Sequence, residues 1–148
     1  MIRAYPNRPI VGLGVVVLRS AAVLLVRRAK PPNAGAWSLP GGAQELGETA
    51  EEGARRELLE ETGVTTGALT LVAHADVIEH DSGRVRFHYT ILDFAGTWLS
   101  GVPVAGDDVS DATWAPLAAL AVYNLTSKTR QVIDAAVSFA AGMATPAD

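Results

Sequence analysis

Three glutamates in the middle of the chain, Glu57, Glu60 and Glu61, have a spacing that could assemble a metal site. Residues at positions i, i+3 and i+4 share one face of an α-helix, so the three carboxylates are expected to lie side by side. Like charges at this spacing destabilise a helix by about 0.2–0.5 kcal/mol per pair, so local stability does not explain them. Carboxylate oxygens are ligands that Mg²⁺ and Mn²⁺ prefer. A divalent-cation site is one interpretation, and a solvated acidic face is the other.

The helix that carries these glutamates has a start and an end marked in the sequence. Thr49 followed by Glu52 forms a capping box, in which the side chain of each residue bonds the backbone amide of the other. Gly63 stands where a helix commonly ends in the left-handed conformation. These signals predict a helix over residues 50–62.

The segment before the helix is rich in residues that interrupt regular structure. The tetrapeptide "LPGG" ends with Pro40, Gly41 and Gly42, which allows a tight turn whose backbone carbonyls face the same cation as the glutamates. Turn and helix together resemble the signature box of the Nudix hydrolases, G-x5-E-x7-R-E-U-x-E-E-x-G-U, where U is a bulky aliphatic residue. Every specified position is met here, by Gly42, Glu48, Arg56, Glu57, Leu58, Glu60, Glu61, Gly63 and Val64.

The resemblance implies an α/β protein with the Nudix fold, which is an α/β/α sandwich around a central mixed β-sheet. It also implies a Mg²⁺-dependent enzyme, with Mn²⁺ able to substitute, in which water attacks a phosphorus atom of a diphosphate linkage. The implied metal ligands are Glu57, Glu60, Glu61 and the Gly41 carbonyl, because a cation must offset the negative charge of the diphosphate. Glu60, Glu61 and Arg56 are implied as catalytic residues, with Arg56 orienting the glutamates through salt bridges.

A catalytic base is expected outside the box. In the family it often lies in a loop before a late strand, and the corresponding run here, "AGDDVSDATW", offers Asp107, Asp108 and Asp111. Asp108 has the expected position relative to Trp114, so we predict that it is the catalytic residue that activates water. The alternative is a loop aspartate that caps a turn.

Three further residues are predicted to bind the substrate. Arg28, at the end of a predicted strand, resembles a phosphate-contacting arginine of related enzymes, and the alternative is a solvated cation at a strand end. Trp37 and Leu39 are predicted to form a wall of the pocket, although buried packing is the favoured role of Leu39.

Other parts of the sequence bear on which substrate the enzyme cleaves. The runs "HYTILDFAG", "AGDD" and "ATWAPLAAL" resemble small bacterial Nudix proteins described as ADP-ribose pyrophosphatases, which favours ADP-ribose, cleaved to AMP and ribose 5-phosphate. A proline that such enzymes often carry beyond the box is absent from the corresponding run "IEHDS". An alternative is a house-cleaning pyrophosphohydrolase that acts on nucleoside and deoxynucleoside triphosphates, including oxidised ones. A remote alternative is a non-catalytic nucleotide sensor, although sensors tend to lose residues of the box.

The elements that must position these residues follow from the hydrophobic pattern. Apolar, β-branched runs bounded by turn residues predict strands over residues 10–19, 21–28, 69–80, 84–96 and 109–117. The first two strands are expected to form a hairpin, and the next two a second hairpin with Gly83 in its turn. Apolar residues at helical spacing predict a second helix over residues 126–141, packed on the core. Residues 30–42 and 101–108 are predicted loops.

Composition limits the classes of protein that are admissible. A chain of 148 residues is expected to form a single domain spanning residues 1–148. The formal net charge of −4 disfavours binding to a nucleic acid polymer and leaves a nucleotide as the expected partner. Cysteine is absent, which excludes disulfides and thiolate zinc sites.

No window approaches the roughly 18 apolar residues of a membrane span, so a cytoplasmic location is expected. The sequence leaves a homodimer open.

Overall fold

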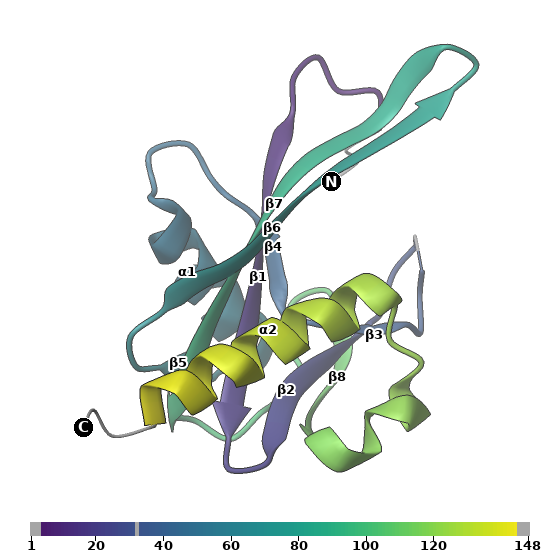
Figure 1. The fold of residues 1–148 in the computed structure, drawn as a ribbon. Coiled ribbons are helices and arrows are strands. Elements are labelled where there is room, and N and C mark those ends of the chain that lie inside the picture. The colour runs from purple at the N-terminus through teal and green to yellow at the C-terminus, as the bar shows by residue number, and fades with distance from the viewer. Residues whose placement is uncertain (1–3, 32, 145–148) are drawn as a thin grey trace.

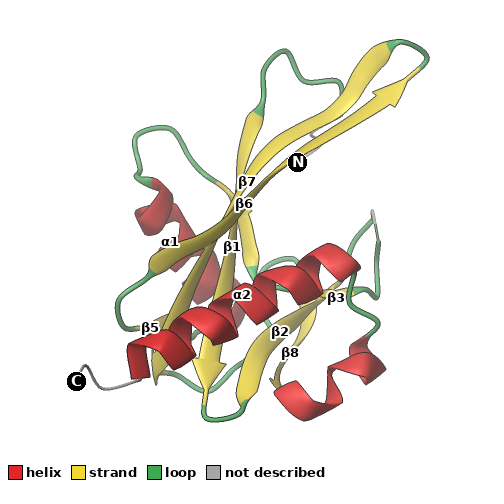
Figure 2. Cartoon of the chain, viewed as in Figure 1, coloured by secondary structure: helices red, strands yellow, loops and turns green. Residues whose placement is uncertain are grey.

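The structure, a computed structural model, describes residues 4–31 and 33–144 (Figures 1 and 2). Its strands are β1 (Ile10–Arg19), β2 (Ala22–Arg28), β3 (Trp37–Ser38), β4 (Gly41–Ala43), β5 (Thr65–Thr66), β6 (Thr70–Asp81), β7 (Arg84–Ser100) and β8 (Val109–Pro116). The helices are α1 (Ala50–Thr62), the 3₁₀ helix η1 (Leu117–Tyr123) and α2 (Ser127–Ala144).

The strands form one mixed sheet with helices on both faces. Its order is β3-β2-β1-β7-β5, with β4 also paired to β1, β6 to β7 and β8 to β2. β1 and β7 pair in parallel, whereas β1 and β2 are antiparallel. Helix α1 packs on one face and α2 on the other, so the predicted α/β/α sandwich around a mixed sheet is confirmed (Figure 1).

β1 is apolar along most of its length because both of its faces are covered. Val16 and Leu18 face α2 and contact the cluster that contains Ile133. Val15 and Val17 face the opposite side and lie in the cluster with Leu58 and Ala54 of α1. Alternating side chains of one strand therefore serve two separate cores, as expected for a strand at the centre of a sandwich.

Both predicted hairpins are confirmed. β1 and β2 pair through Leu18 and Val23, and Ser20 in the connecting turn has a φ of 52°. β6 and β7 pair over most of their length, and Gly83 in their turn has a φ of +81°, a conformation that favours glycine. The far end of this second hairpin extends beyond the helices (Figure 1).

The predicted first helix is confirmed at both ends. Thr49 Oγ1 accepts from the Glu52 amide at 3.1 Å, and the Thr49 amide donates to Glu52 Oε1 at 3.1 Å. Gly63 ends the helix with a φ of 72°. By contrast, β3, β4 and β5 are too short to leave a periodic pattern, so Gly41 and Gly42, which were expected in a loop, lie in a strand. None of the helices among the described residues is long and apolar enough to cross a membrane.

Candidate functional site

Arg56 of α1 is the centre of an ion-pair network. Its Nε donates to Glu48 Oε2 at 3.0 Å and its Nη2 to Glu48 Oε1 at 2.8 Å, so the contact is bidentate. Its Nη1 contacts Glu57 Oε1 at 2.8 Å and Glu60 Oε2 at 3.2 Å. The guanidinium holds the pKa of Glu48 down at about 2, helped by the Glu45 amide. The salt bridges expected of Arg56 are therefore present, and they fix the start of the box against the helix.

Glu57 and Glu61 both have raised pKa values, although positively charged or donor groups lie close to each of them. Glu61 Oε1 accepts from the Gly41 amide at 2.8 Å, yet the pKa of Glu61 is raised to about 7, chiefly by burial and also by the charges of Glu57 and Asp107. Burial is also the largest cause of the raised pKa of Glu57, against the opposing effect of Arg56. Arg28 lowers the pKa of Glu61 but does not restore it. Two partly buried carboxylates side by side favour an added cation.

Gly42 makes room for one of these carboxylates. A Cβ built on Gly42 would overlap the carboxylate carbon of Glu57, so only glycine allows the strand and the glutamate to approach as they do. Gly42, the last residue of "LPGG", is thus needed so that β4 can approach Glu57 of α1 closely, and not for a left-handed turn.

The carboxylates of Glu57, Glu60 and Glu61 are suitable ligands for a hard divalent cation. In this structure, however, they do not converge on one point. In residues 4–31 and 33–144, no three acidic or histidine side chains meet closely enough to hold one ion. Glu57 and Glu60 point at Arg56, and Glu61 at the Gly41 amide. Binding would therefore involve rotation of these side chains. The ligand role of the Gly41 carbonyl stays a prediction.

The loop before β8 packs onto the end of α1. The Gly106 amide donates to the Glu61 carbonyl at 2.9 Å, and the Val104 amide to the Thr62 carbonyl at 3.0 Å. These contacts satisfy carbonyls that the last helical turn leaves without partners. They bring Asp107 close enough for its charge to raise the pKa of Glu57 and Glu61.

Asp108, the predicted base, has a different neighbourhood from Asp107. Its Oδ1 lies 2.9 Å from Lys30 Nζ, and that lysine is the main reason why the pKa of Asp108 is lowered. The charge of Arg28 lowers the same pKa, which puts Arg28 within electrostatic reach of both Asp108 and Glu61. The assignment of the base to Asp108 stays a prediction, and Asp107 emerges as a second candidate.

Trp37 and Leu39 both pack against the core on the α2 side. The ring of Trp37 meets that of Tyr123 edge to face, with centroids 5.2 Å apart. Leu39 therefore packs on the core, as favoured, and both side chains are partly exposed. Their role as a wall of the pocket stays a prediction.

One buried carboxylate was missed. Asp93 lies in β7, is 5% exposed, and has a pKa that burial raises. The available signal was a single charged residue inside the apolar run "YTILDFAG".

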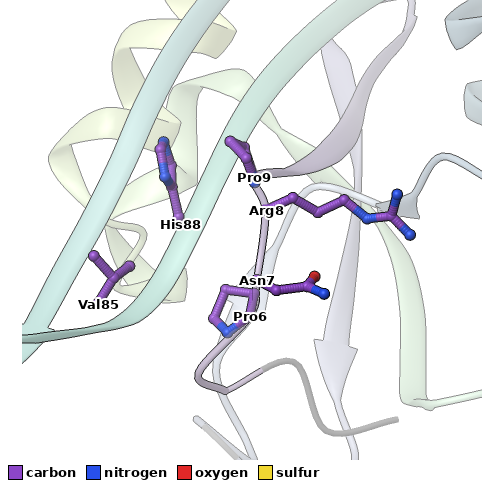
Figure 3. A pocket seen from close by; sticks show the side chains of 6 residues that line it. All are labelled: Pro6, Asn7, Arg8, Pro9, Val85 and His88. Carbon is purple, nitrogen blue, oxygen red and sulfur yellow. The ribbon is translucent and has the colours of Figure 1, made fainter.

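A separate shallow pocket lies where the N-terminal segment runs beside β7 (Figure 3). It is lined by Pro6, Asn7, Arg8, Pro9, Val85 and His88. None of the predicted site residues lines it.

Comparisons with known proteins agree with the box. The profile of the NUDIX domain matches residues 8–136. A protein from Bacillus subtilis (strain 168), described as a putative 8-oxo-dGTP diphosphatase, is 34% identical over 125 residues, which are 83% of this chain and 77% of that protein. The ADP-ribose pyrophosphatase of Methanocaldococcus jannaschii is 35% identical over 105 residues, which are 70% of this chain but only 60% of that protein. The crystal structure of a MutT NUDIX hydrolase from Burkholderia pseudomallei has a TM-score of 0.75 at 30% identity, and covers 86% of this chain and 98% of that one.

Proposed function

The chain belongs to the Nudix hydrolase family, and on that basis we propose that it cleaves the diphosphate linkage of a nucleoside diphosphate joined to a second moiety. ADP-ribose, giving AMP and ribose 5-phosphate, is the favoured substrate, supported by the similarity to the M. jannaschii enzyme. The observation that carries the proposal is the pair of partly buried glutamates, Glu57 and Glu61, on one face of α1, whose pKa values are raised chiefly by burial.

Each residue of the site has a role in this reaction. Nudix hydrolases generally use divalent metal ions, and a bound Mg²⁺ or Mn²⁺ would neutralise charge on the diphosphate. Glu57, Glu60, Glu61 and the Gly41 carbonyl would hold the ion. Arg56 keeps Glu57 and Glu60 within reach through contacts of 2.8 and 3.2 Å.

Residues close to Glu57, Glu60 and Glu61 would bind the substrate and transfer the proton. Arg28 would contact a phosphate, while Trp37 and Leu39 would form one wall of the nucleotide site. Asp108 would accept the proton of the attacking water as the new phosphorus–oxygen bond forms and the bond to the leaving phosphate oxygen breaks.

Substitution of Asp108 tests the proposed base. Asp108→Asn is expected to lower kcat by about 10²- to 10⁴-fold with little change in KM, because the proton is transferred in the transition state. Unfolding would not explain such a loss, since the Lys30 contact is an exposed ion pair of small energetic value.

Two neighbours serve as comparisons in the same assay. Asp111→Asn should leave kcat nearly unchanged, because the exposed Asp111 carboxylate accepts a local hydrogen bond from the amide of the next residue in β8. If Asp108→Asn keeps full turnover while Asp107→Asn loses it, the base is Asp107, and the assignment from the sequence is wrong.

Gly42→Ala tests the close approach of β4 to Glu57. The added methyl group must displace the Glu57 carboxylate, and a displacement of about 1 Å in a catalytic site can cost about 10²-fold in rate. We expect a fall in kcat of at least tenfold. Gly67→Ala is the matched control, because a Cβ there would meet only Thr97 Oγ1, at 3.8 Å. Equal activity of the two variants would contradict the role of Gly42.

A second candidate function is supported by the B. subtilis relative, whose description names 8-oxo-dGTP. A panel of ADP-ribose, other nucleoside diphosphate derivatives and ordinary and oxidised triphosphates, with products identified by mass, separates the two. AMP with ribose 5-phosphate supports the first function, and a nucleoside monophosphate with pyrophosphate supports the second. A nucleotide sensor would bind without turnover, which the complete box argues against. The cytoplasmic location and the homodimer stay predictions.

A further inference from the structure

Asp93 is a buried carboxylate to which the mechanism assigns no role. It is 5% exposed, and within the described part of the chain no hydrogen bond or ion pair reaches its side chain. Burial raises the pKa of Asp93, and the charge of Lys128 in α2 lowers it by less. Among the described residues the fully enclosed polar side-chain atom without a partner is Trp114 Nε1, so the Asp93 oxygens are not completely sealed off and a donor from outside the chain can reach them. A donor group placed there would stabilise the carboxylate more than it stabilises an exposed one.

The carboxylate lies over Gly14 of β1. A Cβ on Gly14 would overlap Asp93 Oδ1, so the carboxylate occupies the space that a neighbouring side chain would fill. Asp93 faces α2, because Ala95, two residues further along β7, packs in the α2-side cluster with Val16.

The residues around Asp93 form a row without bulky side chains. Gly14 lies opposite Gly41 on one side and opposite Asp93 on the other, and Asp93 in turn lies opposite Ala73 of β6. Asp93 is therefore the only member of this row of four that carries a polar side chain.

One end of that row belongs to the reaction centre. The Gly41 amide donates to Glu61 Oε1 at 2.8 Å. Adjacent strands are about 4.8 Å apart, so Asp93, two strands from Gly41, lies about 10 Å from it. A nucleotide whose phosphates sit at Glu61 would span such a distance with its nucleoside.

We propose that Asp93 determines nucleoside specificity by accepting a hydrogen bond from an N–H or O–H group of the substrate's base or ribose. The inference rests on the proposed function, because it assumes a nucleotide with its phosphates at Glu61. A donor group would supply the partner that the carboxylate lacks, whereas a nucleoside without that group would leave Asp93 buried and unpaired.

The test compares selectivity rather than activity alone. kcat/KM is measured for nucleoside diphosphate sugars that carry adenine, hypoxanthine, guanine or uracil, and for their 2′-deoxy forms. Asp93→Asn and Asp93→Ala should lower the preference for the best nucleoside over the worst by about 10- to 100-fold, the range of one hydrogen bond to a charged group. A change along the base series identifies a base contact, and a change between ribose and deoxyribose forms identifies a sugar contact.

Controls separate this role from a structural one. Asp76→Asn, an exposed aspartate of β6, should leave all ratios unchanged. The melting temperature of Asp93→Asn should not fall, because no internal hydrogen bond is lost. Equal loss on every substrate, or unchanged ratios, overturns the proposal. If the parent protein turns over none of the compounds, the proposed function fails instead, and calorimetric binding of the same panel to parent and Asp93→Asn still decides the role of Asp93.

Discussion

Removal of divalent cations is expected to abolish hydrolysis, and addition of Mg²⁺ or Mn²⁺ should restore it. The reason is the charge balance of the site. Glu57 and Glu61 already have raised pKa values beside Arg56 and Arg28, so these arginines cannot also neutralise a diphosphate. Without a cation, phosphate charge and carboxylate charge would meet unscreened in a partly buried site.

The measurement is turnover in EDTA, followed by titration with each metal. The fold should persist in the chelator, because the bidentate Arg56–Glu48 contact and the capping box of α1 need no metal. Circular dichroism in EDTA serves as that control. Full activity in chelator, with the parent fold intact, would exclude the metal mechanism.

Glu61→Gln and Glu57→Gln are each expected to lower kcat by about 10²-fold or more, the loss typical of a catalytic electrostatic element. Glutamine keeps the shape of glutamate but removes the charge that would hold the cation. The metal concentration needed for half-maximal activity should rise as well. Glu51→Gln, on the exposed first turn of α1, is the matched control. Glu51 pairs with Arg55 at 3.4 Å, away from Glu57 and Glu61, so this variant should leave kcat unchanged.

The stability of Glu61→Gln gives an independent readout in the metal-free protein. Burial raises the pKa of Glu61 from 4.5 to about 7, so the folded state holds its proton at pH values where the unfolded state has released it. The ionisation of Glu61 therefore has no effect on the free energy of unfolding below about pH 4.5. It destabilises the fold increasingly as pH rises from there to about 7. Glu61→Gln should match the parent in melting temperature at pH 4 and exceed it at pH 8. A lower melting temperature at both pH values would instead favour a structural acidic face.

Local signals predicted the helix that carries the site. Thr49, Glu52 and Gly63 mark the ends of α1 through contacts within a few residues, and such contacts are visible in the sequence. The spacing of the glutamates then determines which helical face they share. For the same reason, the paired hairpins could be predicted from alternating apolar residues and turn glycines.

The parts that could not be predicted depend on long-range packing. β4 is a strand only because Gly41 and Gly42 pair with β1. Asp107 reaches the glutamates only because the Gly106 amide bonds the end of α1. The burial of Asp93 follows from the register of β7 against β1, which no local pattern encodes.

The parallel pairing of β1 with β7 also has a kinetic consequence. Ile10 lies opposite Tyr89, so each contact of this ladder joins positions 79 residues apart. Closing a loop of that length costs about 4 kcal/mol of chain entropy before the contacts form, which makes such pairing slow. During synthesis, α1 can be capped as soon as its own residues emerge, whereas the row from Gly41 to Asp93 must wait for β7. Substitutions in the β1–β7 ladder other than at Gly14 and Asp93 should therefore reduce the yield of folded enzyme while leaving the turnover of each folded molecule unchanged.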